Sequence, residues 1–139
     1  MLQQILIVDD HDSDLLYGRI MVERSKVAST VATFEDARDA LHYLQQPEGR
    51  SVELVLLDMN MPGMSGFEFL AAFEALNRSG VSPAVVVMLT SSPDPHDRER
   101  AFAFASVRDY MVKPIDQAQM RGIVERIFGP GPASADDRR

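Results

Sequence analysis

Short runs of branched apolar residues alternate along the chain with segments of helical periodicity, and this alternation limits the fold more than any other feature. The runs recur about every 25 residues and are typical of buried strands, at positions 4–8, 27–32, 54–57, 84–89 and 107–112. Strands that are apolar on both faces and alternate with helices predict a doubly wound α/β fold, a five-stranded parallel sheet with helices on both faces. The helices are predicted by apolar residues spaced i, i+3, i+4 and i+7, as at Ala37, Ala40, Leu41 and Leu44 and at Met120, Ile123, Val124 and Ile127.

Capping residues support the expected helix starts, and a change of composition marks the end of the domain. After Phe128 the sequence GPGPASADDRR is rich in glycine, proline and small or charged residues. We therefore expect one domain over residues 1–128 and a flexible tail over residues 129–139. Side-chain caps are predicted at Ser65 with Glu68, at Asp94 before Pro95, and at Asp116 with Gln119.

Composition excludes several classes of function. The 139 residues suffice for one domain of ordinary size. The chain has no cysteine, so a disulfide framework or a thiolate site is impossible, and the reducing cytoplasm is the expected compartment. No stretch approaches the ~20 apolar residues of a membrane span. The net charge of −7 argues against binding to nucleic acid or to anionic lipid.

Chemically matched residues stand where four of the expected strands end. Asp9 and Asp10 follow the first strand, Asp58 the third, Thr90 the fourth and Lys113 the fifth. The carboxyl ends of parallel strands converge at one edge of the sheet, where ligands bind in folds of this class. Carboxylates gathered there repel one another unless a cation lies among them, and an oxygen-only ligand set suits Mg²⁺. A carboxylate nucleophile, a divalent cation, an ammonium and a hydroxyl are the parts that phosphoryl transfer needs.

Four segments carry a resemblance to a known family that extends from Gln4 to about Phe128. They read ILIVDDHDSD, LVLLDMNMPGMSGFEFL, VVVMLTSS and DYMVKPI, in the family's order and at its spacing. In these motifs the chain resembles the receiver domains of two-component response regulators. The resemblance implies a flavodoxin-like sheet with strand order 2-1-3-4-5. It also implies a cytoplasmic phosphorylation switch rather than an enzyme, one that catalyses its own phosphorylation and dephosphorylation.

The resemblance assigns the acceptor and the metal ligands. Asp58 would accept the phosphoryl group, and Asp10 and Asp58 would bind Mg²⁺ directly. Asp9 would hold the water shell of the metal, and the backbone carbonyl of Asn60 would complete the protein ligands. A histidine kinase or a phosphotransfer protein would supply the phosphoryl group, and the altered surface would bind a downstream protein target. A phosphorelay intermediate and a terminal effector are both open.

The resemblance also assigns the residues that respond to phosphorylation. Lys113 would contact the phosphoryl oxygens, with a cis peptide bond before Pro114. Thr90 and Tyr110 would form the switch pair, the hydroxyl moving toward the phosphate as the ring turns inward. One departure stands at Ser106, where many receivers carry a glycine in a pattern like GADDYL. The segments LTSSPDPHDRERA and ASVRDYM resemble a branch of stand-alone, chemotaxis-regulator-like receivers.

Two other functions fit the same sheet edge less well. A Mg²⁺-dependent phosphatase with an aspartyl nucleophile would carry a second Asp two residues later as general acid, whereas this chain has Asn60 there. A pseudo-receiver acting only as a scaffold would have lost a chemical position, and none is lost here. His11, His42 and His96 are scattered along the chain, and each is expected to be a surface residue without a functional role.

The segment DPHDRERAFAFA predicts an output surface. Phe102 and Phe104 lie about 200° apart around a helix, so one ring must be exposed. The stripe formed by Arg98, Ala101, Phe102 and Ala105 predicts that Phe102 points inward and Phe104 outward. We therefore expect a surface for a partner or for a second copy of the chain, centred on the fourth helix and fifth strand, with Phe104 as its anchor.

Overall fold

The chain folds into a five-stranded parallel sheet in the order β2-β1-β3-β4-β5, as a computed structural model shows for residues 1–78 and 84–129. This is the doubly wound, flavodoxin-like arrangement expected from the sequence. Each observed strand overlaps one of the expected runs. The strands are β1 (Leu2–Val8), β2 (Ala28–Phe34), β3 (Val52–Asp58), β4 (Val85–Thr90) and β5 (Val107–Val112).

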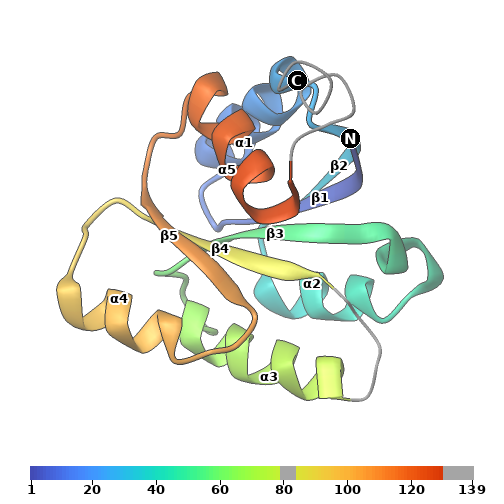
Figure 1. Cartoon of the computed structure of the whole chain (residues 1–139). Coiled ribbons are helices and arrows are strands. Elements are labelled where there is room, and N and C mark those ends of the chain that lie inside the picture. Colours follow the sequence, from blue (N-terminus) through green and yellow to red (C-terminus); the bar gives the residue numbers. More distant parts are fainter. Residues whose placement is uncertain (79–83, 130–139) are drawn as a thin grey trace.

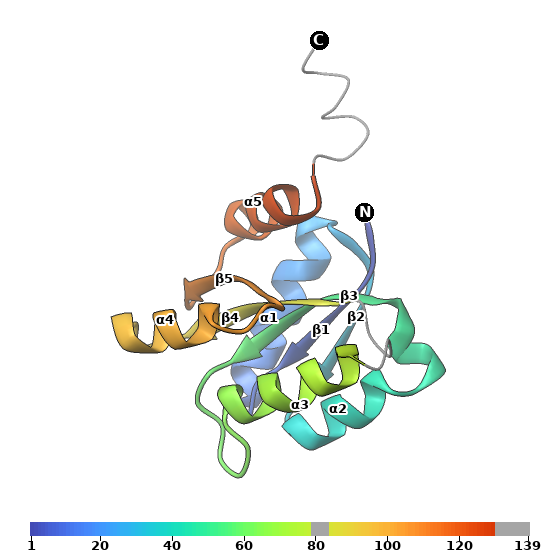
Figure 2. The same cartoon turned by 60° about the horizontal axis from the view of Figure 1, so that its bottom comes forward.

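Helices cover both faces of the sheet (Figures 1 and 2). The helices α1 and α5 lie on one face, and α2, α3 and α4 lie on the other. No helix in the described part of the chain is long and apolar enough to cross a membrane. The helices are α1 (Asp12–Ser25), α2 (Ala37–Leu44), α3 (Gly66–Arg78), α4 (Pro95–Phe102) and α5 (Gln117–Phe128), with a short 3-10 helix at Pro47–Ser51.

Side chains that alternate along the strands belong to two apolar cores, one on each face of the sheet. Leu6, Val55 and Phe69 belong to the core beneath α2 and α3, whereas Ile5, Leu56 and Ile123 belong to the core beneath α1 and α5. The strand β2 differs from the expectation of burial on both faces, because it lies at the sheet edge.

The predicted helix caps are present. Ser65 Oγ accepts from the Glu68 backbone N–H while Glu68 Oε1 accepts from the Ser65 backbone N–H. Asp116 and Gln119 make the same reciprocal pair at the start of α5. Asp94 caps α4 by accepting from the backbone N–H of the second residue after it. The loops that follow β3, β4 and β5 therefore each end in a capped helix, whereas α1 has no side-chain cap. The tail expected over residues 129–139 lies outside the described residues except for its first position.

The expected orientation of the two phenylalanines near α4 is wrong. The helix ends at Phe102, which is 41% exposed, and Phe104 lies in the following turn. The Phe104 ring is partly buried against the core, stacked on Phe67 with ring centroids 6.4 Å apart. The helical angle between the two residues does not apply, because the helix stops before Phe104. Phe102 is the outward ring, and Phe104 anchors the turn to the core.

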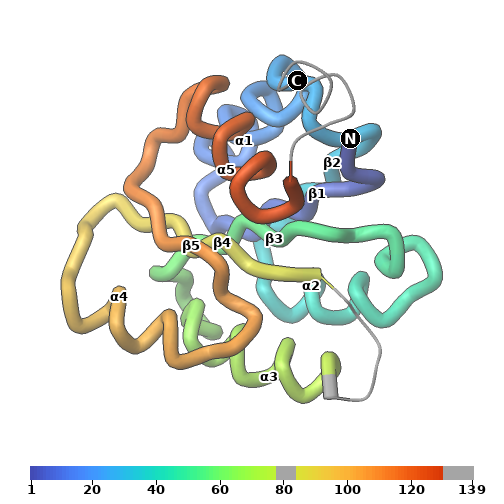
Figure 3. Tube along the Cα trace, viewed as in Figure 1, coloured from blue at the N-terminus to red at the C-terminus, as the bar shows by residue number. Residues whose placement is uncertain are grey.

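The turn before β5 forms without the glycine that many receivers carry. Ser106 is buried, and both its backbone N–H and its hydroxyl donate to Glu74 Oε2 at 2.7 Å. Glu74 lies on α3, so this pair of hydrogen bonds ties α3 to the start of β5. Figure 3 follows the backbone from α4 through this turn into β5, at the end of the sheet.

Candidate functional site

The residues at the strand ends meet at one edge of the sheet. Asp9 directly follows β1, Asp58 is the last residue of β3, and Lys113 directly follows β5. Lys113 Nζ donates to Asp9 Oδ2 at 2.6 Å and lies 3.1 Å from Asp58 Oδ1. Asp9 and Asp58 are only 3% and 4% exposed. One ammonium therefore holds two buried carboxylates that come from neighbouring strands. The peptide bond from Lys113 to Pro114 is cis, as expected.

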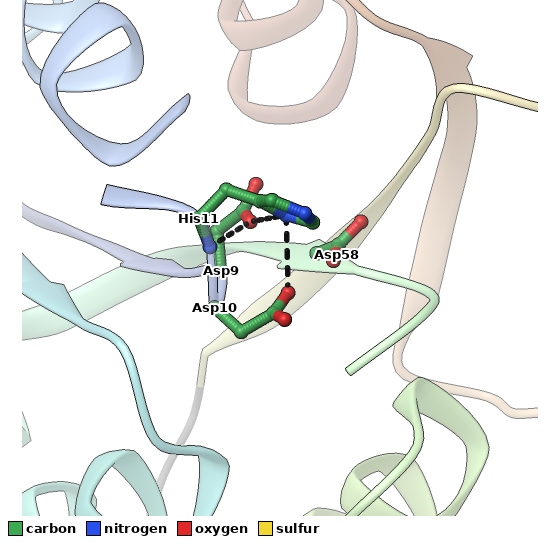
Figure 4. Close-up of side chains that lie close together, drawn as sticks. All are labelled: Asp9, Asp10, His11 and Asp58. Carbon is green, nitrogen blue, oxygen red and sulfur yellow. Dashed lines mark hydrogen bonds and ion pairs between the residues drawn. The ribbon is translucent and has the colours of Figure 1, made fainter. Parts of the chain in front are cut away.

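Four side chains at this edge are arranged as metal ligands could be. Asp9, Asp10, His11 and Asp58 each offer one ligand atom, and these atoms all lie within 4.8 Å of one another. Figure 4 shows the imidazole of His11 and the carboxylates of Asp9 and Asp10 turned toward one another beside Asp58. Three carboxylates around one point make an anionic site of the kind that binds a divalent cation.

Asp10 provides an observation that fits a cation. Its Oδ1 is buried and has no hydrogen-bond partner among the described residues. The His11 Nδ1 lies 3.2 Å from this oxygen, within ion-pair distance but outside hydrogen-bond alignment. A buried carboxylate oxygen without a hydrogen bond is costly unless a cation satisfies it. The residues present therefore fit Mg²⁺, which favours carboxylate oxygens.

Burial and charge set the protonation of the acceptor candidate. Burial, with the nearby Asp9 carboxylate, raises the pKa of Asp58 from 3.8 to about 6, although Lys113 opposes this shift. Burial by itself lowers the pKa of Lys113, but its hydrogen bonds to Asp9 and Asp58 outweigh burial and raise the pKa above its usual value. Lys113 is therefore a permanent cation beside a carboxylate that is ionised at neutral pH.

The loop after β3 holds Asp58 in place. The Met59 backbone N–H donates to the Leu89 carbonyl at 3.0 Å, and the Gly66 N–H donates to the Met59 carbonyl at 2.9 Å. A Cβ at Gly66 would stand 3.0 Å from Met59 Cα, so this close approach favours glycine. Asn60 lies exposed in the same loop, two residues beyond Asp58. The loop thus fixes the backbone on both sides of the acceptor candidate.

The two expected switch residues lie on the neighbouring strands β4 and β5, and no described hydrogen bond joins either side chain to Asp58. Thr90 Oγ1 accepts from the Ser92 backbone N–H at 3.0 Å and lies 3.2 Å from the Ser92 carbonyl. The Tyr110 ring is already buried, and its hydroxyl has no hydrogen-bond partner among the described residues. Tyr110 also lines a groove with α4 residues.

Two residues with contacts in this site, His11 and Asp14, were assigned no role from the sequence. The ring of His11 is exposed, as expected, yet it lies 3.3 Å from Asp9 and 3.2 Å from Asp10. Asp14, in the first turn of α1, forms an ion pair with Lys113 at 3.1 Å. The only signal for either residue was its place in the ILIVDDHDSD segment beside the acidic pair.

Comparisons with known proteins identify the family of this chain. A family model described as the response regulator receiver domain matches residues 5–125. The chain is 31% identical over 140 residues to the probable methanogenesis regulatory protein FilR2 of Methanothrix harundinacea, covering 93% of this chain and 88% of that protein. It is 28% identical to the two-component response regulator ORR1 of Oryza sativa subsp. japonica, over 94% of this chain but only 56% of that longer protein.

A solved structure agrees with these relatives. The chemotaxis protein CheY4 of Vibrio cholerae superimposes with a TM-score of 0.71 at 27% identity, covering 91% of this chain and 99% of CheY4. The chain belongs to the response regulator receiver domain family. It is a phospho-acceptor switch of two-component signalling, in which phosphorylation of an aspartate is typical, and not an enzyme in the usual sense.

Proposed function

We propose that Asp58 is the phosphoryl acceptor and that Lys113 contacts the transferred group. The observation that carries the proposal is the buried Asp58 carboxylate, whose Oδ1 lies 3.1 Å from Lys113 Nζ. An Asp58 oxygen attacks the phosphorus of a phosphohistidine on a histidine kinase or a phosphotransfer protein. The phosphorus–nitrogen bond breaks, an acyl phosphate forms, and the donor imidazole recovers its electron pair. The chain supplies the site for this transfer and for later hydrolysis, so it catalyses both steps on itself.

A divalent cation belongs to the same proposal. Asp10 and Asp58 would bind Mg²⁺ directly, Asp9 would hold its water shell, and the Asn60 carbonyl would complete the protein ligands. The buried Asp10 Oδ1, which has no hydrogen bond among the described residues, and the group of ligand atoms within 4.8 Å of one another support this set. The metal would neutralise charge that develops on the phosphoryl oxygens. Its presence also offsets the repulsion among the carboxylates.

The response to phosphorylation is proposed to run through Thr90 and Tyr110 to the face formed by α4 and β5. Two exposed apolar residues mark this face, Phe102 at 41% and Val112 at 45% exposure. A groove of about 340 Å³ between α4 and β5 is lined by Tyr110 as well as Val112. A downstream protein or a second copy of the chain would bind here. We place this activity in the cytoplasm, where a cysteine-free chain needs no oxidising environment.

The acceptor is tested with radiolabelled acetyl phosphate or phosphorylated kinase. Asp58→Asn keeps nearly the same shape but removes the nucleophile, so incorporation of label should fall to background. Asp39→Asn, which changes an exposed carboxylate on α2, is the matched control and should label like the wild type. Label retained at the wild-type level in Asp58→Asn would place the chemistry on another residue.

A further inference from the structure

Asp14 makes a contact that the proposed phosphoryl transfer does not use. It lies in the first turn of α1, and its Oδ2 accepts a hydrogen bond from Lys113 Nζ at 3.1 Å. The Asp14 side chain is 46% exposed, whereas that of Lys113 is 15% exposed. The contact therefore closes the solvent side of the Lys113 ammonium and joins α1 to the segment after β5.

The Lys113 ammonium has as many carboxylate partners as it has N–H groups. An ammonium carries three N–H groups. Within the described part of the chain its ion-pair partners are three carboxylates, at 2.6 Å in Asp9, 3.1 Å in Asp14 and 3.1 Å in Asp58. A phosphoryl group on Asp58 must therefore share this ammonium with the carboxylates that already surround it.

Asp14 is the partner of Lys113 that neither the proposed phosphoryl group nor the proposed metal engages. Under the proposed function, Asp58 becomes an acyl phosphate and Asp9 faces the metal's water shell. Asp14 belongs to neither arrangement, so its carboxylate continues to attract the ammonium. It also places a negative charge directly beside the ammonium.

We infer that Asp14 is a positioning residue that acts through Lys113 and lowers the affinity of the site for a phosphoryl group. This inference rests on the proposed function, because it needs Lys113 to contact a group on Asp58. Asp14 holds the ammonium toward α1 and offsets part of its charge. Removing that charge frees Lys113 to bind the phosphoryl oxygens more strongly.

The test measures binding of beryllofluoride, a small anionic mimic of the phosphoryl group, to the full chain at saturating Mg²⁺. The dissociation constant is measured by NMR, from the backbone amide signals of ¹⁵N-labelled protein as beryllofluoride is titrated. Asp14→Asn should bind beryllofluoride about two- to fivefold more tightly than the wild type, the size expected for a partly exposed ion pair. Because the cause is charge, this gain should shrink when salt is raised from about 0.05 M to about 0.5 M.

Asp12→Asn is the matched control. Asp12 lies in the same first turn of α1 and carries the same charge, but it is not among the ion-pair partners of Lys113. Both substitutions alter the charge at the helix N-terminus equally. Asp12→Asn should bind beryllofluoride like the wild type, and thermal unfolding should show that both variants are folded.

Three results would overturn the role of Asp14 alone: unchanged affinity in Asp14→Asn, an equal gain in Asp12→Asn, or a gain insensitive to salt. The proposed function fails in a different way. If the wild type does not bind beryllofluoride in the presence of Mg²⁺, or if Asp58→Asn binds it equally well, the acceptor is wrong and the role of Asp14 falls with it.

Discussion

The buried position of Asp58 lowers the stability of the metal-free protein. Its carboxyl binds a proton at about pH 6 in the folded chain, well above its ordinary pKa of 3.8. Between these two values the folded state keeps a proton that the unfolded state has released. The free energy of unfolding therefore falls as pH rises through this window, and the loss persists above it. The ionised carboxylate costs about 2–3 kcal/mol at neutral pH.

Asp58→Asn should remove this cost. In EDTA at about pH 7.5 the variant should be more stable than the wild type by roughly 2 kcal/mol, and the difference should nearly vanish at about pH 4. Urea unfolding at the two pH values measures both free energies. Equal stability at about pH 7.5 would mean that Lys113 compensates the charge of Asp58 in full.

Single residues were predictable from sequence where the sheet itself places them. Asp9, Asp58 and Lys113 come together because parallel strands bring their carboxyl ends to one edge. Asp14 belongs to a helix, and its contact with Lys113 depends on how α1 is rotated against the segment after β5. The local sequence carries no signal for that rotation. The same is true of His11, whose ring direction depends on the turn between β1 and α1.

At the scale of elements, the end of α4 decides which aromatic ring reaches the surface. Periodicity predicts which residues share a face only while the helix continues. Here no glycine or proline marks the end, and Ala103 caps α4 before Phe104 enters the turn. The strands and the other capped helices were predictable, because each carries either a run of apolar residues or a capping side chain near its start.

A pair of alanine substitutions tests this arrangement. Phe104→Ala removes a partly buried ring that stacks on Phe67, and should lower the free energy of unfolding by about 1–3 kcal/mol. Phe102→Ala removes an exposed ring whose described contact is with Arg98, 5.0 Å from the ring centre, and should cost less than about 1 kcal/mol. Urea unfolding at neutral pH compares the two. A larger loss of unfolding free energy in Phe102→Ala than in Phe104→Ala would mean that Phe102, not Phe104, is the ring packed against the core.

At the scale of the whole molecule, a bound metal should stabilise the fold. A ligand that binds only the folded state adds RT ln(1 + [L]/Kd), about 2.7 kcal/mol at a hundredfold excess over Kd. Mg²⁺ should therefore raise the free energy of unfolding of the wild type relative to EDTA. Asp10→Asn should lose most of this gain, because it removes a direct ligand.

Asp39→Asn again serves as the control and should keep the full gain from Mg²⁺, since Asp39 is exposed on α2. The comparison uses the difference between Mg²⁺ and EDTA within each variant, so a general loss of stability cancels. A full Mg²⁺ gain in Asp10→Asn would show that this carboxylate is not a metal ligand.

The strand order has a consequence for a sheet that is only partly assembled. The strand β1 lies between β2 and β3, so Asp9 and Asp10 meet Asp58 as soon as these three strands have paired. Lys113 follows β5, the last of the five described strands along the chain. A chain in which only these three strands had paired would hold its acidic edge without the countercharge of Lys113. The three carboxylates of such a chain would repel one another more strongly than in the complete fold, where the Lys113 ammonium lies between Asp9 and Asp58.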